Sequence, residues 1–81
     1  MCRNITVLRG LDPPASVEEI RAAALQYVRK VGGLQAISPA TQEAVDDAVD
    51  QIARATNALL AALPARRIAP IRQPPLRRLV P

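Results

Sequence analysis

The amino-acid sequence changes character at Pro64, and this change most limits what the chain can fold into. Residues 1–63 carry six basic and seven acidic side chains and are close to neutral. Residues 64–81 hold five of the eight prolines and five arginines, with no acidic residue. Prolines interrupt helices and sheets because they fix φ and lack a backbone donor. We therefore expect residues 1–63 to fold as one domain, followed by a flexible, disordered, basic C-terminal tail over residues 64–81.

The folded part has little apolar material from which to build a core. A single core in a chain of 81 residues rarely supplies more than about 3–5 kcal/mol of stability. Phe and Trp are absent, Tyr27 is the only aromatic residue, and many of the hydrophobic residues are alanines. Cys2 is the only cysteine, so no disulfide within one chain can compensate. We therefore expect a homodimer, in which a second copy enlarges the core.

Residues 17–31 have the pattern of an amphipathic helix. Ser16 and Glu19 are spaced as a capping box, in which each side chain bonds to the backbone N–H of the other residue. Gly32-Gly33 provides the glycine with which helices commonly end. Apolar side chains recur at helical spacing on one stripe, formed by Val17, Ile20, Ala24, Tyr27, Val28 and Val31.

Residues 39–63 predict a second, longer helix. Ser38 followed by Pro39 is a typical helix start, and Pro64 ends the pattern. We expect Asp50 and Arg54 to pair along one turn of this helix. Apolar residues follow a seven-residue repeat, formed by Val45, Val49, Ile52, Thr56, Leu59 and Leu63.

Together these patterns predict an all-α fold. The short link between the two helices favours an antiparallel hairpin, preceded by an extended N-terminal arm over residues 1–15. One apolar face of such a hairpin stays open. We expect two hairpins to close it as a dimeric four-helix bundle, although docking onto a larger complex is an alternative. No run approaches the roughly 18–20 apolar residues of a membrane span, and no secretory signal is visible, so we expect a cytoplasmic protein without membrane attachment.

The sequence offers little for catalysis. Histidine is absent, and Ser16 and Ser38 are assigned to helix starts, so no nucleophile has a neighbouring base. We therefore expect no enzyme activity and no cofactor. The second helix carries an acidic run of Glu43, Asp46, Asp47 and Asp50. Glu43, Asp47 and Asp50 can lie along one helix face and, paired across a dimer, could bind a hard cation. The place of the run opposite the apolar stripe favours a solvated surface instead.

Cys2 is the one candidate for metal binding or redox chemistry. Removal of Met1 would expose an N-terminal cysteine, whose amine and thiol have reference pKa values near 7.7–8.0 and 8.5. Such a pair can hold a soft metal, and the neighbouring Arg3 favours the thiolate. A zinc site, however, requires four ligands. Packing as a small apolar residue is the alternative, and we favour it.

The arginines of the C-terminal tail are the strongest partner-binding feature. Cationic side chains contact phosphates, but the tail has no aromatic residue on which a base could stack, so binding to nucleic acid would not depend on sequence. A solvated extension and a docking peptide are the alternatives. We predict a small non-catalytic interaction or adaptor protein that binds nucleic acid or an acidic protein, with thiol chemistry at Cys2 as the alternative function. The arginines are Arg66, Arg67, Arg72, Arg77 and Arg78.

Three stretches resemble one known family: the opening Met-Cys-Arg-Asn-Ile, the Pro13-Pro14-Ala15 turn and the helical residues 19–31. The chain resembles, over roughly residues 1–63, the small bacterial family catalogued as domain of unknown function 2277. The resemblance implies no catalytic residue. It does draw attention to the N-terminal segment and to a polar surface beside it, although ordinary packing and helix-end neutralisation explain each residue singly. The residues of that surface would be Arg21, Gln26, Tyr27, Arg29 and Lys30.

Overall fold

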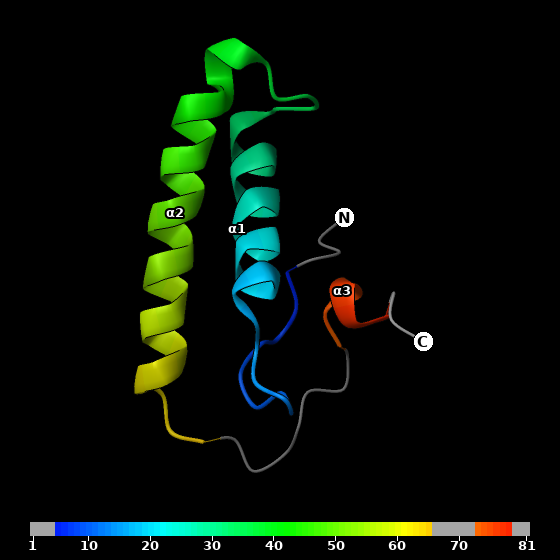
Figure 1. The fold of residues 1–81 in the computed structure, drawn as a ribbon, viewed down its shortest axis with the longest axis vertical. Coiled ribbons are helices and arrows are strands. Elements are labelled where there is room, and N and C mark those ends of the chain that lie inside the picture. The colour runs from blue at the N-terminus through cyan, green and yellow to red at the C-terminus, as the bar shows by residue number, and fades with distance from the viewer. Residues whose placement is uncertain (1–4, 66–72, 79–81) are drawn as a thin grey trace.

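The computed structural model describes residues 5–65 and 73–78. Within these ranges it contains helices α1 (Val17–Gly32), α2 (Pro39–Ala62) and α3 (Pro75–Arg78), and no strand. Helices α1 and α2 pack side by side in opposite directions, and the single turn α3 lies beside α1 on the side away from α2 (Figure 1). The predicted all-α hairpin is therefore confirmed. No helix in the described part of the chain is long and apolar enough to cross a bilayer.

Local capping sets the two ends of α1. The Ser16 hydroxyl accepts from the Glu19 N–H at 3.1 Å, and the Glu19 carboxylate accepts from the Ser16 N–H at 2.8 Å. At the other end Gly33 has a φ of 65°, a left-handed conformation that glycine adopts without strain. The next N–H, of Leu34, donates to the Arg29 carbonyl at 2.9 Å. The predicted start is confirmed, and the helix runs one residue further than predicted.

Helix α2 starts where the sequence predicts and ends one residue earlier than predicted. Pro39 occupies the first turn, and the Ser38 N–H donates to the Thr41 hydroxyl at 3.1 Å. Leu63 is extended, with φ −74° and ψ 145°. The residue before a proline disfavours the helical conformation, so Pro64 ends the helix at Ala62.

The core between α1 and α2 is thin. Its centre consists of Ala24 of α1 with Val45 and Val49 of α2, which are 3–5% exposed. No side chain among the described residues is less than 2% exposed. Much of the predicted apolar stripe is on the surface, including Tyr27 at 50% and Leu59 at 55% exposed. Other apolar side chains flank the centre and are partly buried: Leu25, Val28, Leu34, Ile37, Ile52 and Ala53.

One ion pair connects the two long helices. Asp50 accepts a hydrogen bond from the Arg21 guanidinium of α1 at 2.6 Å. The predicted pair of Asp50 with Arg54 is therefore wrong, because the packing of α1 brings a different cation to this carboxylate. Both side chains are more than 40% exposed, and exposed pairs of this kind contribute less than about 1 kcal/mol.

The N-terminal arm packs across the base of the hairpin, where α1 begins and α2 ends. Leu8 is buried at 9% exposed, and it lines the same cleft as Ile20 of α1 and Leu60 of α2. The Arg9 guanidinium donates to the Pro64 carbonyl, with the Nε–O distance at 2.9 Å. The arm therefore fixes the point at which the chain leaves α2.

Candidate functional site at the base of the hairpin

The structure describes only part of the predicted partner-binding tail. Arg77 and its contacts are described, and Arg78 belongs to α3. The other tail arginines lie outside the described residues, as does Cys2, so the metal or thiol role of Cys2 stays a prediction. These arginines are Arg66, Arg67 and Arg72.

Arg77 holds the end of the tail against the first turn of α1. Its Nε donates to Glu19 Oε2 at 2.7 Å, and its Nη2 donates to Glu19 Oε1 at 3.2 Å. The same Nη2 donates to the backbone carbonyls of Pro14, at 3.0 Å, and Pro13. The Arg77 side chain is 16% exposed and the Glu19 side chain 5%. A two-point pair of this kind is both strong and directional.

Residues 73–78 of the predicted flexible tail take a defined conformation in the structure. Pro74 is buried, and its carbonyl accepts from the Arg77 N–H at 3.0 Å, which closes the turn of α3. A short proline-containing segment gains little from its own hydrogen bonds. Here the ion pair with Glu19 and the contacts to the arm provide the stabilisation that the segment lacks alone.

Glu19 is ionised, although it is buried. Burial raises the pKa of its carboxyl group, but the hydrogen bond from Arg77 and the bond from the Ser16 N–H outweigh that effect and leave the pKa below its ordinary value. The first turn of a helix also favours a negative charge. The buried carboxylate accepts three hydrogen bonds, one from the Ser16 N–H and two from Arg77, and so anchors both groups.

Sequence reasoning missed two members of this site. It assigned Glu19 to the helix cap alone, although a capping carboxylate uses one oxygen for the cap and leaves the other oxygen available. That spare acceptor is a usable signal for a second partner. Arg9 gave no signal, because its acceptor is a backbone carbonyl 55 residues away, and any carbonyl could have served.

Acidification should weaken this anchor. Because the pKa of Glu19 is lower in the folded state, its contribution is present above the unfolded pKa, about 4.5, and is lost as the pH falls through the folded value. In urea denaturation at pH 7, wild type should be more stable than Glu19→Gln. This difference should shrink as the pH falls below about 4.5. A difference that stays constant to pH 3 would show that ionised Glu19 does not stabilise the fold.

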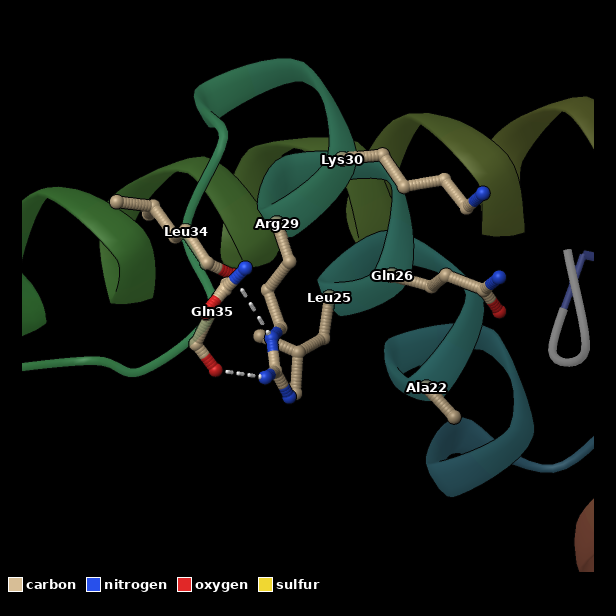
Figure 2. Close-up of a pocket in the computed structure, with 7 residues that line it drawn as sticks. All are labelled: Ala22, Leu25, Gln26, Arg29, Lys30, Leu34 and Gln35. Carbon is tan, nitrogen blue, oxygen red and sulfur yellow. Dashed lines mark hydrogen bonds between the residues drawn. The ribbon is translucent and has the colours of Figure 1, made fainter. Parts of the chain in front are cut away.

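A second cavity, of about 480 Å³, lies at the opposite end of α1 (Figure 2). Arg29 crosses it and donates to the backbone carbonyls of Leu34, at 3.3 Å, and Gln35. This arginine therefore closes the link between the two helices. The cavity contains no nucleophile beside a base. Its lining consists of Ala22, Leu25, Gln26, Arg29, Lys30, Leu34 and Gln35.

The five residues proposed for a polar surface do not form one site. Gln26, Arg29 and Lys30 line this second cavity. Arg21 instead pairs with α2, and Tyr27 is half exposed without lining the cavity.

The carboxylates of α2 are exposed and separated. Asp46 accepts from the Gln42 amide at 2.8 Å, and Asp50 is paired with Arg21. Across the described ranges, no three histidine, cysteine or acidic side chains gather closely enough to hold a metal ion.

Comparison with known proteins places the chain in a family. Neither the curated proteins nor the solved structures contain a match. A family model matches residues 1–80, beyond the stretch over which the resemblance is visible by eye. The match therefore includes α3 and the anchor residue Arg77. This chain belongs to the family described as "Uncharacterized conserved protein (DUF2277)".

Proposed function

We propose that this protein is a small non-catalytic interaction protein that binds an anionic partner through the arginines of its C-terminal tail. The observation that carries the proposal is the Arg77–Glu19 pair, which fixes the tail to α1 and uses one of its five cations. Residues 64–81 contain no acidic side chain that could pair with the others. We assign the other four arginines of the tail to the contact with the partner: Arg66, Arg67, Arg72 and Arg78.

The anchors at both ends of the segment support this function. The arm holds the chain at Pro64 through Arg9, and α1 holds it at Arg77 through Glu19. Residues 66–72, which include three arginines, therefore connect two fixed points at the base of the hairpin. Fixing both ends of a segment reduces the conformational freedom that it loses on binding. The hairpin would act as a support that presents the segment.

The chemistry of the segment favours nucleic acid as the anionic partner. Guanidinium groups match phosphate geometry, since they donate two parallel hydrogen bonds. The tail lacks aromatic residues and carboxamide-rich patterns for reading bases, with Gln73 as its only amide side chain. Binding should therefore follow the phosphate backbone and depend strongly on salt. Four phosphate contacts predict a log–log salt slope of about −3 to −4 on duplex DNA.

The described residues also support a role without catalysis. Ser16 is engaged in the α1 cap, and Ser38 begins α2. The carboxylate with the largest burial, Glu19, is neutralised by Arg77. None of these groups adjoins a free base or a nucleophile within the described ranges.

The test compares three full-length proteins for binding to mixed-sequence DNA and RNA across a salt series. One is wild type, one carries Arg→Gln at all four proposed positions, and one carries Arg→Lys at the same positions. Arg77 is kept in each, so the anchor stays intact. We expect salt-steep binding by wild type and the lysine variant, and at least tenfold weaker binding by the glutamine variant.

Three further outcomes separate the alternatives. Equal binding by wild type and the glutamine variant would overturn the proposal. Binding to polyglutamate but not to nucleic acid would identify an acidic protein as the partner class. Cys2→Ser should leave nucleic-acid binding unchanged, and loss of binding in that variant would favour the thiol hypothesis instead.

A further inference from the structure

One side of the hairpin has no charged side chain. Helical periodicity and the antiparallel packing of α1 and α2 bring together apolar and small residues that are not covered by the described part of the chain. Three of them are large and widely exposed: Tyr27 at 50%, Val31 at 70% and Leu59 at 55%. We name this surface the uncharged face; it comprises Ala23, Tyr27, Val31, Ala48, Ile52, Ala55 and Leu59.

The opposite side of the hairpin is different in character. It carries the Arg21–Asp50 pair, and the same cleft is lined by Arg54 and Val17. A neighbouring cleft on that side includes Glu18 and Asp46. Charged side chains therefore mark the solvent side, and their complete absence distinguishes the uncharged face.

The thin core described above explains why a further apolar contact is needed.

We propose that the uncharged face binds the same face of a second copy of this chain, related by a two-fold axis parallel to the helices. A face without charges meets its own copy without like-charge repulsion. Under this symmetry α1 of one subunit packs antiparallel on α2 of the other, which forms a four-helix bundle. The ring of Tyr27 would then pack against the small side chain of Ala48 of the partner subunit.

The charges along the edges favour this arrangement over its alternatives. Lys30 lies on the outer edge of α1 beside the uncharged face, and it makes no ion pair with any described residue. Asp47 lies on the outer edge of α2 and is exposed. Stacking α1 on the partner's α2 brings these opposite charges together. Stacking α2 on α2 would instead place like charges side by side.

The first test measures the mass of the full-length protein in solution by sedimentation or light scattering. Val31→Arg, on the uncharged face, should raise the dimer dissociation constant at least tenfold, because it places a charge in an apolar contact. Val17→Arg is the matched control, since Val17 is similarly exposed, at 65%, on the charged side of α1. It should leave the dissociation constant within about twofold of wild type. Circular dichroism checks that each variant keeps its helices.

The second test concerns the geometry. Lys30→Glu should weaken the dimer, and combination with Asp47→Lys should restore it, because the pair is then reversed. A wild-type monomer at all concentrations from about 1 µM to about 1 mM would overturn the proposal. So would a dimer that Val17→Arg disrupts and Val31→Arg does not. Failure of the charge reversal alone, with Val31→Arg still disruptive, would overturn the stacking of α1 on α2.

Discussion

Replacement of Ile20 by alanine should lower the free energy of unfolding by about 2–4 kcal/mol. Ile20 is 4% exposed and lines the cleft where the arm meets both long helices, together with Leu8, Leu11 and Leu60. Removal of three carbon atoms there loses their burial and leaves a cavity. A loss of this size is most of the about 3–5 kcal/mol that a core of this size supplies. Urea denaturation followed by circular dichroism measures it.

The control for this prediction is Val17→Ala, three residues earlier on the same helix. Val17 is 65% exposed, so its truncation removes little buried area and should change stability by less than about 0.5 kcal/mol. Comparable losses in the two variants would contradict the packing described here, because burial would then not decide the cost.

The Glu19–Arg77 anchor should also be costly to break. Arg77→Ala should lower the free energy of unfolding by about 1–2 kcal/mol, since hydrogen bonds to charged groups contribute about 1.5–3 kcal/mol and the released carboxylate regains some water. Glu19→Ala should cost about 2–3 kcal/mol, because it removes the α1 cap as well, and such caps contribute about 1 kcal/mol. A double-mutant cycle isolates the pair itself.

That cycle should give a coupling energy of at least about 1 kcal/mol. The comparison is Arg21 with Asp50, an ion pair of similar distance whose side chains are 43% and 49% exposed. Solvent screens this second pair, so its coupling should stay below about 0.5 kcal/mol. Equal coupling in the two cycles would mean that burial of Glu19 adds nothing to its interaction with Arg77.

The two long helices could be predicted from the sequence because their determinants are local. Ser16 and Glu19 are three residues apart, and Gly33 directly follows the helix that it ends. Each signal requires only neighbouring residues, and each appears in the structure. The predicted end of α2 was one residue too late because the pattern of apolar residues includes Leu63. Pro64 disfavours the helical backbone conformation at Leu63, so the helix ends before it.

The contacts at the base of the hairpin could not be predicted in this way. Glu19 and Arg77 are 58 residues apart, and the sequence contains ten other cations that could have paired with that carboxylate. Which one does so depends on the path of the arm and of α3. The same limit explains the wrong partner for Asp50. A pair within one helix was visible in the sequence, and the cation on the neighbouring helix was not.

The apolar stripes were predicted correctly as patterns but not as burial. A stripe shows which side of a helix avoids water; it does not show how many neighbours cover that side. With one partner helix each, α1 and α2 bury Ala24 and Val49 and leave Tyr27 and Val31 exposed. The apolar side chains of each stripe that no neighbouring helix covers are the basis of the dimer proposed above.

The anchor also bears on the order in which the molecule is completed during synthesis. α1 begins at Val17, yet the cation that neutralises its capping carboxylate Glu19 lies 58 residues further along the chain, at Arg77. The hairpin requires only contacts between α1 and α2 and can form early, whereas contacts of high sequence separation form late. The contact that neutralises the beginning of α1 therefore forms after the hairpin. Until Arg77 has been synthesised, the Glu19 carboxylate lacks this cation.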